Sequence, residues 1–219
     1  MAQIFPASAN TIFRVVLVLI AAAAIGSIGL AYAYERSGNE TRVGLVAEQP
    51  VPFSHQHHAR ELGIDCRYCH TSVETSSSAG MPSSDTCMSC HSQIWNQSPT
   101  LAAVRDSLSE TKPLRWRRVH DLPDFVYFNH GIHVQKGVGC ASCHGRIDLM
   151  PLTWKAEPLT MQWCLQCHRH PEDHVRPKDE VFNMAYRLSK TEQRDVGNRL
   201  VDAYGIPRDR LTNCSTCHR

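Results

Sequence analysis

The longest apolar stretch lies near the start of the chain, where residues 15–34 read VVLVLIAAAAIGSIGLAYAY and carry no charge. A helix of this length is about 30 Å long, which matches the hydrocarbon thickness of a bilayer. A signal peptide is the alternative, because Ala31-Tyr32-Ala33 resembles a cleavage site, but signal peptides have apolar cores of only about 7–15 residues. The pattern therefore predicts an uncleaved single-pass anchor over residues 1–34, and Arg14 favours a cytoplasmic N-terminus.

Beyond residue 34 the apolar positions form short and broken patterns. Residues 35–50 begin with the polar run ERSGNETRVG and are predicted to be a linker. Helices are predicted over residues 99–109 and 182–204, the second ending at Gly205 and Pro207. These two helices leave most of residues 51–219 without a regular hydrophobic period.

The pentapeptide C-x-x-C-H occurs five times, and the five copies use all ten cysteines. In chain order we name them motifs 1 to 5: Cys66–His70, Cys87–His91, Cys140–His144, Cys164–His168 and Cys214–His218. This is the attachment pattern of c-type haem, in which two thiols form thioethers and the histidine ligates the iron. The composition predicts roughly 0.03 such pentapeptides by chance. We therefore expect five covalently bound haem c groups.

The predicted haem-attachment residues follow directly from the motifs. The thioether cysteines are Cys66, Cys69, Cys87, Cys90, Cys140, Cys143, Cys164, Cys167, Cys214 and Cys217. The proximal iron ligands are His70, His91, His144, His168 and His218. Because thioether formation takes place outside the cytoplasmic membrane of bacteria, this part of the chain is expected on the periplasmic or extracytoplasmic side.

C-x-x-C also occurs in zinc half-sites and in redox-active dithiols. A zinc site takes two half-sites, which five identical units cannot supply evenly. Neither alternative explains why a histidine follows the second cysteine in every copy. A disulfide oxidoreductase needs one such motif rather than five, so the haem interpretation is favoured.

Five porphyrins are large apolar bodies, and packing against them compensates for an aromatic content of only 7%. The predicted fold class is mainly α with much irregular loop, a multihaem cytochrome c domain wrapped around five haems and preceded by one transmembrane helix. The formal net charge of +2 omits ten haem propionates and therefore says nothing about partners. No nucleic-acid partner is predicted. No nucleophile, acid–base pair or phosphate loop stands out, so no catalytic residue is predicted either.

Residues 51–219, the predicted pentahaem domain, contain an internal duplication. Residues 53–58 read FSHQHH before motif 1, and residues 128–133 read FNHGIH before motif 3, so both follow F-x-H-x-x-H. A second haem motif starts 21 residues after the first in one copy and 24 residues after it in the other. The pattern predicts two di-haem modules, residues 53–91 and 128–168, and a last haem site at residues 214–218.

A low-spin electron-transfer haem takes a second axial ligand, usually histidine or methionine. If the F-x-H-x-x-H segments are helical, their two histidines lie about one turn apart and can reach two different haems. The predicted distal ligands are therefore His55, His58, His130 and His133. For the fifth iron the candidates are Met161, Met150 and His120, and the sequence leaves this choice open.

The F-x-H-x-x-H…C-x-x-C-H module is similar to that of class III multihaem cytochromes. That similarity implies that the first histidine ligates the haem of its own motif and the second a neighbouring haem. More specifically, VHDLPDFVYFNHGIHVQKGVGCASCHGRIDLMPL, continuing to LTMQWCLQCHRHPE, resembles the pentahaem ActA subunits of alternative complex III. Length, motif number and the single N-terminal helix also match across the chain. His170 departs from the family pattern, which more often has Asn, so no ligand role is expected for it.

This resemblance implies a membrane complex that oxidises menaquinol. Electrons would pass through an iron–sulfur subunit and the haem subunits to a periplasmic carrier or terminal oxidase, with this chain as a relay. The alternative is a small membrane-anchored multihaem quinol dehydrogenase that feeds a periplasmic reductase. That alternative needs an open or unusual ligand at a haem near the membrane, whereas His55 lies ready upstream of motif 1. A catalytic multihaem reductase is disfavoured because all five motifs end in histidine.

Overall fold

The computed structural model describes residues 4–218, so the first three residues of the predicted anchor and Arg219 lie outside the described part. The chain divides into two units, one up to Arg42 and one from Val43 onward. In chain order the helical segments are α1 (Ala9–Glu35), α2 (Gly38–Thr41), η1 (Gln56–Glu61), α3 (Cys66–Cys69), α4 (Ser84–His91), η2 (Pro99–Leu101), α5 (Ala102–Ser109), α6 (His130–Gln135), α7 (Ala141–His144), η3 (Ile147–Leu149), α8 (Met161–Arg169), η4 (Pro171–Asp173), η5 (Lys178–Glu180), α9 (Lys190–Ala203) and α10 (Cys214–Cys217).

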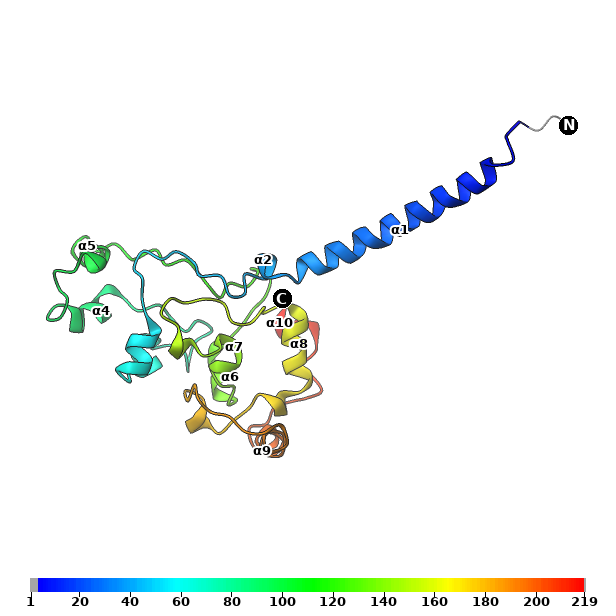
Figure 1. Cartoon of the computed structure of the whole chain (residues 1–219). Coiled ribbons are helices and arrows are strands. Elements are labelled where there is room, and N and C mark those ends of the chain that lie inside the picture. The colour runs from blue at the N-terminus through cyan, green and yellow to red at the C-terminus, as the bar shows by residue number, and fades with distance from the viewer. Residues whose placement is uncertain (1–3, 219) are drawn as a thin grey trace. The chain divides into compact units, whose positions relative to one another are not determined.

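Short helices joined by long loops make up the second unit (Figure 1). Between residues 4 and 218 the extended backbone forms no strand, only isolated β-bridges. These join Val43 to Lys155, Val46 to Trp154 and Val138 to Val175. The mainly α fold with much irregular loop is therefore confirmed.

The first unit is dominated by α1, a single long apolar helix (Figure 1). By length and composition the span Ala9–Thr41 is apolar enough to cross a membrane. One polar side chain within the apolar stretch, Ser27, satisfies its hydroxyl internally by donating to the carbonyl of Ala23 at 2.8 Å. This helix agrees with the predicted anchor in position and in character.

The helix predicted over residues 99–109 is present as η2 followed directly by α5. Leu101 and Val104 point inward from it and form a small core with Val51. Cys87 and Trp116 pack against that core. The cluster therefore fixes motif 2 against α5.

The helix predicted over residues 182–204 begins later than predicted, at Lys190. Ser189 and Glu192 form a capping box: the Glu192 backbone N–H donates to Ser189 Oγ at 3.3 Å, and the Ser189 N–H donates to Glu192 Oε2 at 3.0 Å. Such a box satisfies two helix-start donors at once and fixes the first residue of the helix. The apolar residue Met184 misled the prediction, because it is buried in the preceding turn and not in the helix.

α9 packs closely on η4 because its buried face carries Gly197. A Cβ at this position would collide with the backbone carbonyl of Glu172. Gln193, one turn earlier, donates to that same carbonyl at 3.0 Å and to the carbonyl of Val175 at 2.8 Å. Gly197 thus permits α9 to lie close to η4, and these hydrogen bonds stabilise the contact.

We expect Gly197→Ala to lower the free energy of unfolding of the holoprotein by about 1–3 kcal/mol, because the added methyl group overpacks a backbone contact. The sign of the change in the free energy of unfolding tests the close packing, since glycine to alanine inside an unobstructed helix stabilises a protein by about 1 kcal/mol. Denaturant titration measures the difference. Arg199→Ala, at an exposed position of the same helix, is the control and should change stability by no more than about 0.5 kcal/mol. A stabilised Gly197→Ala protein would contradict the close packing.

Candidate haem-binding site

The C-x-x-C-H motifs all fold in short helical segments: α3, α4, α7, α8 and α10. The two cysteines of each motif are three positions apart, so helical backbone places both thiols on one face. Caps fix two of these turns, since Asp65 accepts from the backbone of Arg67 in α3 and Thr160 accepts from that of Trp163 in α8. Each motif therefore presents two thiols and an imidazole from about one turn of chain.

None of the ten cysteines forms a disulfide. Burial raises the pKa of the Cys143 thiol to about 12 and the pKa values of Cys140 and Cys167 to about 11. Redox-active dithiols have instead thiol pKa values below about 8.5, because the thiolate is the reactive form. The burial of these thiols therefore gives no support to the dithiol alternative.

Four of the five motif histidines direct Nδ1 at a backbone carbonyl. The distances are 2.8 Å from His70 to Gly80, 3.1 Å from His91 to Ile94, 2.8 Å from His168 to Leu211 and 3.1 Å from His218 to Phe125. An Nδ1–H that donates leaves the lone pair on Nε2, which is the tautomer that binds a metal. His144 of motif 3 is the exception, because its buried Nδ1 has no hydrogen-bond partner among residues 4–218.

The two F-x-H-x-x-H segments adopt the same local geometry, one at η1 and the other at α6. In both, the phenylalanine ring packs edge-on against the first histidine and stacks on the second. The centroid distances are 4.9 Å for Phe53–His55, 4.4 Å for Phe53–His58, 4.8 Å for Phe128–His130 and 4.5 Å for Phe128–His133. Each phenylalanine therefore holds two imidazoles in a fixed relative orientation.

These four histidines also have Nδ1 bonded to a protein oxygen. The distances are 3.0 Å from His55 to Thr153 Oγ1, 2.9 Å from His58 to the Ser54 carbonyl, 3.0 Å from His130 to the Ser77 carbonyl and 2.7 Å from His133 to the Asn129 carbonyl. As in the motif histidines, the bonded Nδ1 leaves Nε2 for a metal.

Three of the four histidines face a motif histidine across a gap that suits one iron. The centroid distances are 6.1 Å for His58–His91, 6.4 Å for His130–His144 and 6.2 Å for His133–His168. Two imidazoles on opposite sides of one iron have centroids roughly 6 Å apart, because each metal–nitrogen bond is about 2 Å long. The donor set and its spacing thus fit a haem iron at motifs 2, 3 and 4.

The remaining histidine of the four, His55, belongs to the surroundings of motif 1. Burial, followed by the nearby His70 of motif 1, lowers the pKa of His55 to about 4. The imidazole is therefore neutral at pH 7, as an iron ligand must be. This placement agrees with His55 as the distal partner of His70, which stays a prediction.

The structure separates the three candidates for the fifth iron. Met150 is buried and its methyl group packs beside Gly145, directly after motif 3. Met161 is 65% exposed at the start of α8. His120 lies against His144, with 4.3 Å between ring centroids. In the described part of the chain the ring found against His218 of motif 5 is that of Phe125, at 5.8 Å, and the fifth distal ligand stays open.

Motifs 1, 2 and 3 are neighbours in space. The Tyr68 hydroxyl of motif 1 bonds to the Ser89 hydroxyl of motif 2 at 2.8 Å. The loop after motif 1 supports the helix before motif 3, since the His130 N–H donates to the Ser77 carbonyl at 3.2 Å. Motif 1 therefore lies between motifs 2 and 3.

Motifs 3, 4 and 5 continue the series. His133, in the helix before motif 3, faces His168 of motif 4. His168 in turn donates to the carbonyl of Leu211, just before motif 5, and Figure 1 shows α8 and α10 side by side. The contacts give the spatial order 2–1–3–4–5.

Electrostatic effects between the cysteines follow the same order. In each of four motif pairs, burial and then a cysteine of the neighbouring motif raise the pKa of a thiol. The affected and neighbouring residues are Cys69 and Cys87, Cys140 and Cys66, Cys143 and Cys167, and Cys164 and Cys217. The motifs thus form one continuous series.

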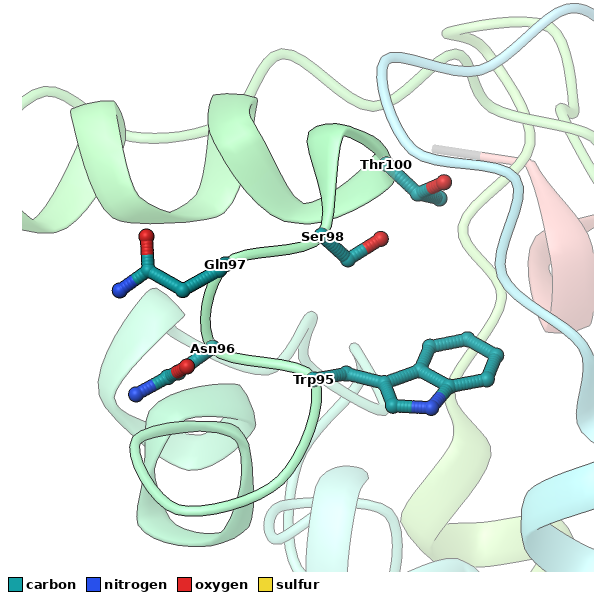
Figure 2. A pocket seen from close by; sticks show the side chains of 5 residues that line it. All are labelled: Trp95, Asn96, Gln97, Ser98 and Thr100. Carbon is teal, nitrogen blue, oxygen red and sulfur yellow. The ribbon is translucent and has the colours of Figure 1, made fainter.

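A hollow of about 480 Å³ lies beside motif 2, at one end of this series (Figure 2). It is lined by Trp95, Asn96, Gln97, Ser98 and Thr100. Arg105 holds the turn by donating to the carbonyls of Asn96 and Ser98 at 2.7 and 2.9 Å, and Trp95 has a left-handed backbone with φ 58°. None of its lining residues is titratable, so the hollow itself offers no acid–base chemistry.

Two families of known proteins indicate the class of protein to which this chain is similar. Residues 126–219 match the family of cytochrome c7 and related cytochromes c, and residues 33–104 match the class III cytochrome c family. The chain is thus similar to multihaem cytochromes c in both halves of its motif-bearing region. These families bind haem c covalently, which confirms the predicted kind of cofactor; the number of five stays a prediction.

A particular relative is the multihaem cytochrome c subunit of a menaquinone reductase from Nitratidesulfovibrio vulgaris (strain Hildenborough). It is 37% identical to this chain over 98 residues, which are 44% of this chain and 46% of that protein. The match thus spans less than half the length of this relative. The narrower prediction of an alternative complex III subunit stays a prediction.

The groups that orient the histidines carry no signal in the sequence. Thr153 bonds to His55 although the two residues are 98 positions apart. The other acceptors are backbone carbonyls, for example those of Gly80 and Leu211, and every residue has such a carbonyl. No sequence signal marks these acceptors, because the fold alone brings them to the imidazoles.

Proposed function

We propose that this chain is a membrane-anchored pentahaem cytochrome c that relays electrons within a quinol:electron-acceptor oxidoreductase of the alternative complex III type. The observation that carries this proposal is the continuous series of motifs 2–1–3–4–5, in which each motif or a segment beside it contacts the next motif or a segment beside that one. Haem c, when bound, supplies reversible one-electron oxidation and reduction of its iron.

The residues of the chain would attach, ligate and orient the five cofactors. The cysteine pairs would fix each haem to a short helical turn, and the motif histidines would ligate its iron. The opposing imidazoles of residues such as His58 and His133 would supply the second ligand, which would exclude substrate from the iron and suit electron transfer rather than catalysis. Buried neutral imidazoles avoid the cost of a charged ligand in the interior.

The N-terminal helix and the relative from Nitratidesulfovibrio vulgaris support attachment to a membrane and membership of a multi-subunit complex. α1 is long and apolar enough to hold the protein in the cytoplasmic membrane as a single-pass subunit. The relative from Nitratidesulfovibrio vulgaris is a subunit of a menaquinone reductase. We therefore place the haem domain on the periplasmic side, with an iron–sulfur protein of the same complex as electron donor and a periplasmic carrier or terminal oxidase as acceptor.

Extraction of native membranes with a mild detergent, followed by mass spectrometry of the proteins that stay bound, tests this function. We expect a large assembly with an iron–sulfur subunit and polytopic membrane subunits. Recovery of the chain alone, or with only a soluble periplasmic reductase, would contradict the relay within a complex. That result would support the alternative, a small membrane-anchored multihaem quinol dehydrogenase.

A further inference from the structure

Arg176 is a buried arginine whose charge has no opposite charge beside it. The residue is only 7% exposed. Its Nε is buried without a hydrogen-bond partner, and no ion pair among residues 4–218 involves its guanidinium. Burying a charged group is costly unless it is paired, so an arginine in this position calls for an explanation.

The guanidinium of Arg176 lies against the residue that precedes motif 3. The Arg176 backbone N–H donates to the carbonyl of Gly137 at 2.8 Å. A Cβ at Gly139 would collide with the guanidinium, so the two residues are in close contact. Cys140, the first thioether cysteine of motif 3, follows Gly139 directly. The glycine thus leaves the space that brings a positive charge to the start of motif 3.

Neutral groups hold the guanidinium in place. Its Nη1 donates to the carbonyl of Asn183 at 3.3 Å, and its central carbon lies 4.9 Å from the ring centroid of Tyr186, within the range of a cation–π contact. Glu180 accepts from the side-chain amide of Asn183 at 2.6 Å and forms no ion pair with Arg176. These contacts fix the position of the charge without neutralising it.

The positive charge is permanent, and it acts on motif 3. Burial lowers the pKa of Arg176, but a guanidinium stays protonated in proteins. Burial raises the pKa of the Cys140 thiol to about 11, and Arg176 acts against this rise, as a positive charge near the sulfur does. Because Arg176 is buried, water and salt screen its charge less than they screen a charge at the surface.

We propose that Arg176 is a fixed positive charge that raises the reduction potential of the haem attached at motif 3. The inference rests on the proposed function, in that Cys140 and Cys143 attach a haem. A ferrous iron carries one positive charge less than a ferric iron, so a nearby cation favours the reduced state. The thioethers join one edge of a porphyrin and the propionates extend from the opposite edge. The carboxylates of this haem therefore lie away from a cation beside Cys140 and leave it unneutralised.

A redox titration of the full-length holoprotein and three variants tests this role. In Arg176→Met we expect the reduction equilibrium constant of one haem to fall about tenfold, which is about 59 mV for one electron. Arg176→Lys should stay close to the wild-type potential, because it keeps the charge. Arg187→Met removes an exposed arginine next to Tyr186 and is the matched control, with no expected shift because solvent screens an exposed charge.

Haem counting and a second background separate the possible failures. If mass spectrometry finds no haem on the motif 3 peptide of the wild-type protein, the proposed function and this inference are overturned together. In the double serine variant of Cys140 and Cys143, Arg176→Met should shift none of the four remaining potentials. A shift there would overturn the inference alone, because Arg176 would then act on another haem.

The comparison among the variants decides whether the charge itself is responsible. Unchanged potentials in Arg176→Met, or an equal fall in Arg176→Lys or in Arg187→Met, would overturn the inference. An apolar residue of similar volume often replaces a buried charge without loss of stability, so Arg176→Met is expected to fold. If it does not, Arg176→Gln removes the same charge with a polar side chain, and the same outcomes apply to it.

Discussion

Replacing Cys140 and Cys143 by serine is expected to remove one haem c and to divide the electron relay into two halves. The helix before motif 3 contacts the loop after motif 1 and brings His133 against His168 of motif 4, so loss of the haem at motif 3 is expected to leave motifs 2 and 1 apart from motifs 4 and 5. Intact mass measures the loss of one haem. When quinol reduces the purified complex, we expect two of the four remaining haems to be reduced at the wild-type rate and two to lag.

Two matched variants complete this experiment. Replacing the cysteine pair Cys87 and Cys90, or the pair Cys214 and Cys217, also removes one haem but from an end of the series. One of these variants should keep four haems that are reduced together, and the other should lose the entry point, which reveals the direction of electron flow. Reduction of all four haems at the wild-type rate in the motif 3 variant would contradict the order 2–1–3–4–5.

The spatial order of the motifs could not be predicted from the sequence, although the motifs themselves could. A C-x-x-C-H pentapeptide is local, so its thiols and imidazole meet on one helical turn whatever the rest of the chain does. The order depends on contacts such as Tyr68 with Ser89 and His133 with His168, which join residues 21 and 35 positions apart. Nothing in the sequence marks a serine or a tyrosine as the partner of the other. The order of the motifs in space therefore differs from their order in the chain: motif 1 lies inside the series and motif 2 at its end.

The histidine pairs were predictable in part, because the duplication marks them. The repeated F-x-H-x-x-H pattern predicted the four histidines, and the structure adds that Phe53 and Phe128 hold their rings in the same way. The position of His120 beside motif 3 could not be predicted, since a lone histidine eight residues before the repeat offers no period or spacing. Its neighbour His144 is reached only through the fold.

The adjacent histidines His57 and His58 allow a sharp test of distal ligation. His58 faces His91 of motif 2 at 6.1 Å, whereas His57 pairs with Glu61 on the surface at 2.9 Å. We expect His58→Leu to turn one haem from low-spin to high-spin and to open its iron to carbon monoxide, because a saturated iron excludes such a ligand. His57→Leu should leave all haems low-spin. Spectroscopic titration of the reduced holoprotein with carbon monoxide measures the number of open sites.

Combining His58→Leu with the loss of motif 2 locates the opened iron. The Cys87 and Cys90 double serine variant removes the haem that His91 ligates, so adding His58→Leu to it should open no further site. If His58 served its own motif 1 instead, the combined variant would still bind one additional carbon monoxide. That outcome would contradict the pairing of His58 with His91 and would weaken the link between motifs 1 and 2. The expected outcome means that one short helical turn ligates two haems, with His55 at motif 1 and His58 at motif 2, and so holds neighbouring cofactors at a fixed spacing.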